Sequence, residues 1–312
     1  MNHIKWIFLD PSNILRSGWR FAVFVVVFLF CAAAFGGVAI VMLSAAGIDA
    51  PPGSTVFIVT NSVVSLVLAV LVGWLGGKYL EGLPFRALGA WFTRFWLKHF
   101  VLGSVIGVLT VGFAVLIAAA FGGLRFEPNS VDLTDAIFRS MLSSLAIFAV
   151  AAAFEEALFR GYILQTFNRS GLAWLAIILT SSFFGIAHMT NPNVGIISTL
   201  NTVLAGVWFS VAYLKTRDLW FVWGMHLFWN WVQGAVFGIE VSGITAITAA
   251  PLLKEIDKGP TWLTGETYGI EGGLACTAAI IVSTVMIYFL RILRPSEEMA
   301  TLTSPGNRIE ST

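Results

Sequence analysis

Eight long apolar runs dominate this 312-residue sequence. Each is close to, or longer than, the roughly 20 residues that an α-helix needs to cross a bilayer. Apolar residues make up 57% of the chain and charged residues only 11%, whereas about a quarter of a typical soluble domain is charged. The runs fall near 21–47, 54–77, 99–121, 136–165, 172–188, 194–213, 219–237 and 272–290. The sequence therefore predicts an all-α membrane protein with eight transmembrane helices, in which residues 1–312 form a single polytopic membrane domain.

Helices are expected because a spanning segment must satisfy its backbone hydrogen bonds internally, and the runs lack the alternation of a transmembrane β-strand. No small-residue cleavage site follows the first run, so we expect a retained helix and not a signal peptide. Cys31 and Cys276 each lie inside an apolar run, so no disulfide framework is indicated. The net charge of +1 does not suggest nucleic acid as a partner. The partner that the composition does indicate is the lipid bilayer.

The distribution of Lys and Arg predicts the orientation, because cytoplasmic loops carry an excess of basic residues. With the N-terminus inside, 14 of the 18 basic residues lie on the cytoplasmic side and four on the other. The inner set is Lys5, Arg16, Arg20, Lys78, Arg86, Arg94, Lys98, Arg160, Arg169, Lys215, Arg217, Arg291, Arg294 and Arg308; the outer set is Arg125, Arg139, Lys254 and Lys258. Both termini should be cytoplasmic.

Three stretches are not expected to span. Residues 79–98, rich in aromatic and basic side chains, are typical of an interfacial cytoplasmic segment. Residues 238–271 should form a long outer loop, a candidate for a partial lid. The polar tail of about 295–312 is expected to be disordered.

Ionisable residues inside the runs are few. Glu155 and Glu156 are the only two of the 17 acidic residues well inside a run, and His188 and His226 are two of only four histidines. A charge in the bilayer interior costs several kcal/mol by most measures, so such residues indicate a function. The alternative is a structural ion pair or interhelical hydrogen bonding. For four such residues together, a functional site is the better interpretation.

Spacing distinguishes the two glutamates. Adjacent helical residues point about 100° apart, so only one of them can face a given cavity fully. Glu156 and Arg160 are four residues apart with the acid first, the favoured order for a helical ion pair. Arg160 can neutralise Glu156, which leaves Glu155 as the candidate general base. The alternative is that Glu156 and Arg160 form a purely structural salt bridge.

The histidines predict a water- or metal-binding site. His226 and Asn230 share one helix face, and His188 ends the fifth run. Two imidazoles with an amide or carboxylate oxygen suit a zinc-type site that keeps one position open for water. A nearby glutamate can take the proton of that water and later give it to a leaving amine. Glu155 lies 14 residues before the helical hairpin tip at Arg169 and His188 lies 19 after it, so both can reach one depth inside the bundle.

Three short motifs occur in order on three predicted helices. The first, E-E-x-x-x-R, is matched by residues 155–160 (EEALFR), the second, F-x-x-x-H, by residues 184–188 (FGIAH), and the third, H-x-x-x-N, by residues 226–230 (HLFWN). Together they resemble the signature of the CAAX-processing and bacteriocin-processing (CPBP, or Abi) intramembrane proteases. The motif-bearing core covers about residues 130–240.

The resemblance implies an eight-helix fold and a peptidase whose site opens toward the cytosolic side. It implies that Glu155 activates water, that His188, His226 and Asn230 hold water, metal or the oxyanion, and that Glu156 and Arg160 shape the site. A divalent metal, with zinc as the leading candidate, and a membrane-associated or prenylated (CAAX-type) protein or peptide substrate are the expected partners. The chain is more similar to a bacterial member of the family than to a eukaryotic one, and we expect it in the bacterial cytoplasmic membrane.

Two other functions remain alternatives. A proton-coupled transporter could use buried Glu and His as a relay, and a catalytically inactive scaffold could keep the fold without the activity. The sequence contains no His-Glu-x-x-His motif, no Gly-x-Ser-Gly motif and no intramembrane aspartate pair, so it does not indicate other membrane-protease chemistries. The oligomeric state is not predicted.

The topology can be tested with reporter fusions. Fusions after Ser170 and Arg217 should report the cytoplasm, and a fusion near Lys254 should report the opposite side, because the basic residues are distributed in that way. A cytoplasmic result near Lys254 would contradict the eight-helix topology.

Overall fold

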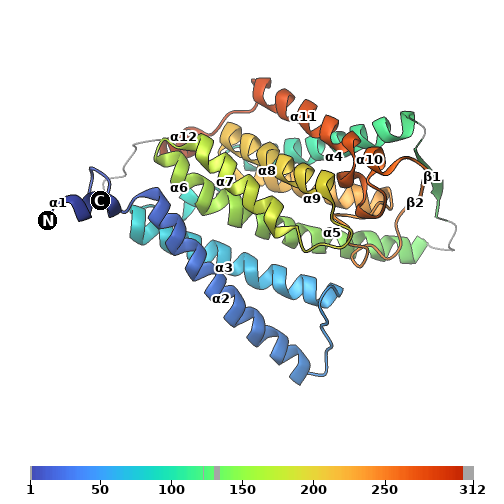
Figure 1. The fold of residues 1–312 in the computed structure, drawn as a ribbon, viewed down its shortest axis with the longest axis horizontal. Helices are drawn as coiled ribbons and strands as arrows, with labels where there is room; N and C mark the ends of the chain where they lie inside the picture. Colours follow the sequence, from blue (N-terminus) through green and yellow to red (C-terminus); the bar gives the residue numbers. More distant parts are fainter. Residues whose placement is uncertain (1, 122, 130–133, 305–312) are drawn as a thin grey trace.

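The computed structural model describes residues 2–121, 123–129 and 134–304, and it is built almost entirely of helices (Figure 1). The longer helices are α2 (Ser17–Ala45), α3 (Thr55–Glu81), α4 (Trp96–Ala120), α5 (Thr134–Glu156), α7 (Ala173–Ala187), α8 (Ile196–Thr216), α9 (Leu219–Trp231) and α11 (Leu274–Phe289). The shorter helices are α1 (Asn2–Phe8), α6 (Leu164–Arg169), α10 (Thr261–Thr264) and α12 (Glu297–Thr303). Helices α1, α6 and α12 lie at one end of the bundle, and α10 lies at the other.

Every predicted apolar run contains a helix. Within the described residues, five helices are long and apolar enough to cross a membrane: α2, α3, α4, the continuous helix over 135–169, and α8. Helices α7 and α11 are apolar but shorter, and α9 is extended by a π-helical turn, Val232–Val236. The structure confirms a multi-pass helical architecture, whereas the count of eight spans and the position of the termini remain predictions.

Helix α9, which carries two of the predicted site residues, packs against α4 through small residues. Gly103 and Gly107 of α4 lie directly against the backbone of α9, and a Cβ at either position would collide with the carbonyl of Phe221 or of Met225. Such close helix approach at small residues spaced by four is typical of membrane proteins, where dispersion packing replaces the hydrophobic effect between helices. The α4–α9 contact therefore fixes the position of α9 in the bundle.

The start of α9 is held by Asp218. Its carboxylate accepts a hydrogen bond from the backbone N–H of Trp220 at 3.0 Å, as a helix N-cap does, and pairs with His99 Nδ1 of α4 at 2.7 Å. Burial raises the pKa of Asp218 above its ordinary value. This pair ties α4 and α9 together at the end of the bundle that carries α6 and α12.

The first motif lies where the α-helix changes its winding. Helix α5 passes into a π-helical segment, Ala157–Ile163, before it continues as α6. Single π turns inside α-helices are rare and often occur at functional sites. The change begins at the residue that follows Glu156.

Two predictions need correction, the disordered tail and the purely helical fold. The tail was expected to be disordered, but residues 297–303 form α12, with Met299 and Leu302 buried, because these apolar side chains can pack on the bundle end; residues 305–312 lie outside the described part. The outer loop 238–271 contains short ordered elements, including α10 and β2 (Leu253–Asp257). Strand β2 pairs antiparallel with β1 (Leu124–Pro128), so the fold is not purely helical. Between the end of α3 at Glu81 and the start of α4 at Trp96, the helical structure is a 3₁₀ turn, Phe85–Leu88, as expected of a segment that does not span.

Glu81 forms a buried ionic cluster at the end of α3. Its carboxylate contacts Arg20 of α2 at 2.6 Å and Arg169 of α6 at 2.8 Å, and all three side chains are less than 10% exposed. Thr166 also donates a hydrogen bond to this carboxylate, at 2.9 Å. One acidic side chain thus holds three helices together.

We predict that Glu81→Gln destabilises the protein by about 3–5 kcal/mol, because two buried arginines lose their counter-charge. The measurement is thermal or denaturant unfolding in detergent. Asp135→Asn is the matched control, because its partner Arg139 and Asp135 itself are more than 70% exposed and such pairs contribute about 1 kcal/mol or less. Equal stability of the two variants would contradict a bracing role for Glu81.

Candidate active site

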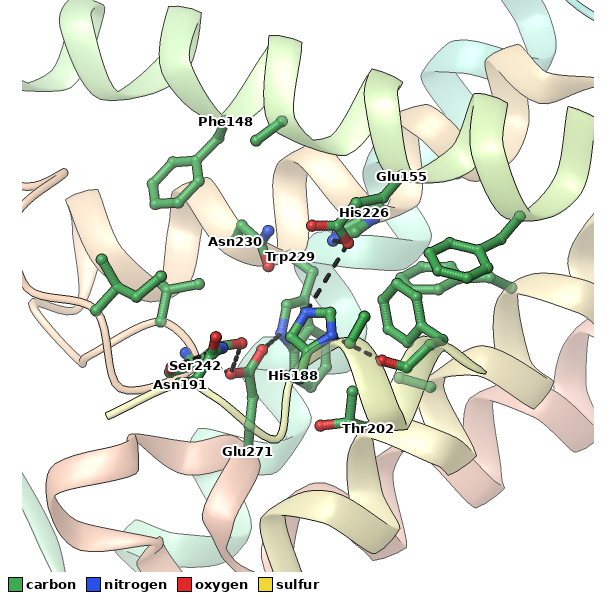
Figure 2. A pocket seen from close by; sticks show the side chains of 18 of the residues that line it. Phe148, Glu155, His188, Asn191, Thr202, His226, Trp229, Asn230, Ser242 and Glu271 are labelled. Carbon is green, nitrogen blue, oxygen red and sulfur yellow. Dashed lines mark hydrogen bonds and ion pairs between the residues drawn. The ribbon is translucent and has the colours of Figure 1, made fainter. Parts of the chain in front are cut away.

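A cavity of about 280 Å³ lies among α3, α5, α7, α8, α9, α11 and the 238–271 segment (Figure 2). Four of the predicted site residues line it: Glu155 from α5, His188 at the end of α7, and His226 and Asn230 from α9. The remaining wall is mostly apolar and aromatic. A concave, apolar cavity with a few convergent polar groups is the usual form of a binding or active site. The structure thus brings together residues from three helices that the motifs alone could not place.

Glu155 faces both imidazoles. Its Oε2 lies 4.0 Å from His188 Nε2 and 3.8 Å from His226 Nε2. These separations exceed a direct hydrogen bond and leave room for one bridging atom. In the part of the chain that the structure describes, this buried Oε2 has no hydrogen-bond partner. The Glu155 carboxylate and the two imidazoles therefore face one point without direct hydrogen bonds between them.

The far nitrogen of each imidazole is fixed by an acceptor. His188 Nδ1 lies 2.8 Å from the carbonyl oxygen of Phe184, and His226 Nδ1 lies 2.9 Å from Glu156 Oε1. A carbonyl and a carboxylate can only accept, so Nδ1 carries the proton in both rings. In the neutral rings, each Nε2 then presents its lone pair to the cavity. The F-x-x-x-H spacing of the second motif fits the bond from His188 Nδ1 to the Phe184 carbonyl, because residue 184 is one helical turn before residue 188.

Glu156 lies behind the cavity and not in it. Its Oε1 accepts from Arg160 Nη1 at 3.1 Å as well as from His226, and both Glu156 and Arg160 are almost fully buried. Arg160 also donates to the carbonyl of Gly206 in α8 at 3.1 Å. The predicted i, i+4 pair is therefore present, and it orients His226 through Glu156. This division of roles between adjacent glutamates follows from their different directions on the helix.

The guanidinium of Arg160 is surrounded by aromatic rings. It lies 4.9 Å from the ring centre of Phe184, 5.1 Å from that of Phe209 and 5.7 Å from that of Phe159. Cation–π contacts are strongest when the cation is desolvated, as here. The three rings line the cavity, whereas Arg160 does not, and we call these four residues the aromatic layer.

Sequence reasoning missed a second polar group in the cavity, centred on Glu271. Its Oε1 accepts from the indole N–H of Trp229 at 3.1 Å, and its Oε2 accepts from the backbone N–H and hydroxyl of Ser242 at 2.6 and 2.7 Å. Asn201 donates to the backbone carbonyls of Glu271 and Gly273. Glu271 lies among glycines just before an apolar run. This sequence is typical of a loop, and no helical spacing relates Glu271 to the other site residues. Asn201 did carry a signal, a polar amide inside the sixth run.

The sequence predicts a metal ion at His188, His226 and Asn230. Among the described residues, no group of three or more His, Cys, Asp and Glu side chains has the arrangement of a metal site. The ligands expected from the sequence, however, are two histidines and an asparagine. Two imidazoles whose Nδ1 atoms are held by a carboxylate and a carbonyl, with free Nε2 lone pairs beside an unpartnered carboxylate oxygen, have the chemistry of metal ligands with their outer supporting bonds.

Comparison with known protein families supports the resemblance drawn from the motifs. Residues 137–232 match the family described as type II CAAX prenyl endopeptidase Rce1-like. All six predicted site residues lie inside this segment, which is under a third of the chain. The motif-bearing segment is therefore similar to the CAAX protease family. No curated protein and no solved structure matches the chain. The resemblance drawn from the three motifs is confirmed for this CAAX protease core.

The two glutamates should differ in their effect on stability. We predict that Glu156→Gln lowers the unfolding temperature in detergent, because buried Arg160 loses its counter-charge, and breaking a buried pair costs roughly 3–5 kcal/mol. Glu155→Gln should leave stability nearly unchanged, because its Oε2 has no partner to lose. The two variants make the same Glu→Gln change at adjacent positions, so each is the control for the other. Equal unfolding temperatures would contradict the separate roles.

Proposed function

We propose that this protein is an intramembrane endopeptidase that hydrolyses a peptide bond of a membrane-associated protein or peptide, with Glu155 as the base that activates water. The observation that carries the proposal is the convergence of the Glu155 carboxylate with two Nε2 atoms in one cavity. The CAAX protease match over the same residues supports a peptidase. A cavity mostly walled by apolar groups also favours an apolar polypeptide as substrate.

Peptide hydrolysis needs a base, an acid and a donor for the oxyanion. Glu155 takes a proton from a water molecule between its carboxylate and the imidazoles, and the hydroxide adds to the scissile carbonyl. The same carboxyl then gives the proton to the leaving amine. The amide N–H of Asn230 donates to the oxyanion that forms on the carbonyl oxygen. Glu156 acts through His226, which it keeps in the Nδ1-protonated form.

A divalent metal fits the same residues. His188 and His226 would hold it through Nε2, and the side-chain oxygen of Asn230 would be the third ligand. When bound, such an ion lowers the pKa of water and polarises a carbonyl. The imidazole tautomers support this proposal, because a neutral ring with its proton on Nδ1 offers Nε2 only as an acceptor. Zinc is the metal that this nitrogen-rich set would favour.

The transporter alternative is less well supported. A relay that couples transport to protons needs groups that reach the site from both sides of the membrane. On one side of the cavity, the rings of the aromatic layer surround Arg160, whose side chain is fully buried. Because an arginine side chain stays protonated in proteins, Arg160 cannot relay protons on this side of the site, which does not favour a transporter.

We predict that Glu155→Gln abolishes turnover while the protein stays folded, because the amide keeps the shape of the carboxylate but cannot accept the proton. The measurement is comparative membrane proteomics of cells with the wild type or the variant, in search of a polypeptide whose processing stops. Glu127→Gln is the control, because Glu127 is exposed in β1, outside the cavity. Unchanged processing in the Glu155 variant would refute the proposal.

The histidines and the metal can be tested together. Alanine variants of His188 and His226 should each lose nearly all activity, and the double variant should lose little more, because groups that act as a unit are far from additive. Metal analysis of the purified proteins should find near-stoichiometric metal in the wild type and little in His188→Ala. An active, metal-free wild type that is insensitive to chelator would leave Glu155 as the base and remove the metal from the proposal.

A further inference from the structure

A second cavity, of about 300 Å³, lies on the other side of α5 from the candidate active site. It is lined from α3, α5, α9, the 3₁₀ turn Phe85–Leu88 and the π-helical segment Ala157–Ile163. Glu155 lines the first cavity and Glu156 lines the second, because adjacent helical residues point in different directions. Helix α5 is therefore the wall between the two cavities.

The second cavity exists because one face of this wall carries small side chains. Ala149, Ala153, Ala157 and Gly161 all line it, and they follow one another at intervals of four residues, the spacing of one helix face. Gly161 is buried, yet a Cβ placed on it would meet no packing neighbour within 4 Å among the described residues. Larger side chains at these positions would fill the space. The cavity is thus a property of the sequence on this helix face.

The wall of the second cavity offers almost no polar surface to a ligand. Its one charged residue among the described ones, Glu156, is 1% exposed, and its Oε1 accepts from Arg160 and His226. The indole N–H groups of Trp220 and Trp223, which also line the cavity, donate to backbone carbonyls. Cavities without polar groups hold apolar ligands and not water. A hydrocarbon chain is therefore the ligand that fits.

Aromatic and basic side chains flank this cavity at the start of α9. The ring of Trp220 lies 5.3 Å from the ring of Trp96, the first residue of α4. Beside Trp96, Arg94 and Lys98 lie over the ring of Phe95, at 4.6 and 5.7 Å from its centre, and both cations are exposed. Tryptophans gather at the membrane–water interface, and basic side chains there attract anionic lipid head groups. This end of the cavity therefore has the composition of an interface that faces lipid head groups.

We propose that the second cavity binds one acyl chain of an anionic phospholipid, with the head group beside Arg94 and Lys98. The bilayer supplies such chains at the surface of α3 and α5, which are both long and apolar enough to span it. The cation of Arg94 is available to a phosphate, because its pair with Glu297 is 4.0 Å long and exposed. The apolar cavity and the exposed cations thus select the same molecule. This binding is independent of the proposed peptidase activity.

Photolabelling tests the acyl-chain site. The full chain is reconstituted in phosphatidylcholine nanodiscs that contain a phosphatidylglycerol probe with a diazirine in one acyl chain, and the adducts are mapped by mass spectrometry of peptides. Ala153→Phe fills the cavity, and Ala146→Phe, at an exposed position of α5, is the matched control. We expect adducts on the α5 and α9 residues of the cavity in the wild type and in Ala146→Phe, and few in Ala153→Phe. Cavity adducts that persist in folded Ala153→Phe would overturn the proposal. So would their absence from the wild type, which would leave the cavity to a polypeptide segment or a second copy of the chain.

The head group is tested with a phosphatidylcholine probe of the same acyl chain and with a variant that combines Arg94→Gln and Lys98→Gln. We expect the anionic probe to give about tenfold more cavity adducts than the zwitterionic probe, because each basic residue near the membrane surface strengthens the binding of an anionic lipid. The combined variant should reduce labelling by the anionic probe to the level of the zwitterionic probe. Both positions are exposed, so this variant decides the question even where Ala153→Phe does not fold. Equal labelling by the two probes in the wild type would overturn the proposal.

Discussion

The structure around the cavity depends on one buried ionic interaction, the Glu156 carboxylate between Arg160 and His226. Arg160 is fully buried, and moving such a charge out of water is costly unless it is paired and hydrogen-bonded. Glu156 and the carbonyl of Gly206 accept hydrogen bonds from its two Nη atoms, and three aromatic rings surround it, whereas its Nε has no hydrogen-bond partner among the described residues. These partners come from α5, α7 and α8, with His226 from α9, so satisfying one charge fixes the relative positions of four helices.

The same interaction prepares the chemistry. Because Glu156 holds the proton of His226 on Nδ1, the Nε2 lone pair faces Glu155, and the Phe184 carbonyl does the same for His188. Adjacent glutamates on one helix thereby differ in environment: one is neutralised in the packed interior and one is left unpartnered in a cavity. Environments that differ in this way are how proteins give two chemically identical groups different roles.

The packing of α9 complements this electrostatic framework. Close contact at Gly103 and Gly107 positions α9 along α4, and Asp218 fixes its start. The candidate site residues His226 and Asn230 therefore project from a firmly packed helix, and the less regular 238–271 segment completes the cavity wall.

The sequence by itself predicted the helical membrane class, the six candidate site residues and the Glu156–Arg160 pair, because these depend on local rules: the length of an apolar run, the cost of charge in lipid and the 3.6-residue period. It could not determine which atom of each histidine faces Glu155, since that depends on Phe184 and Glu156, the latter 70 residues away from His226. It also missed Glu271, the β1–β2 sheet and α12. Each of these is stabilised by contacts with distant parts of the chain, and only the tertiary structure decides whether a polar loop residue meets a partner there.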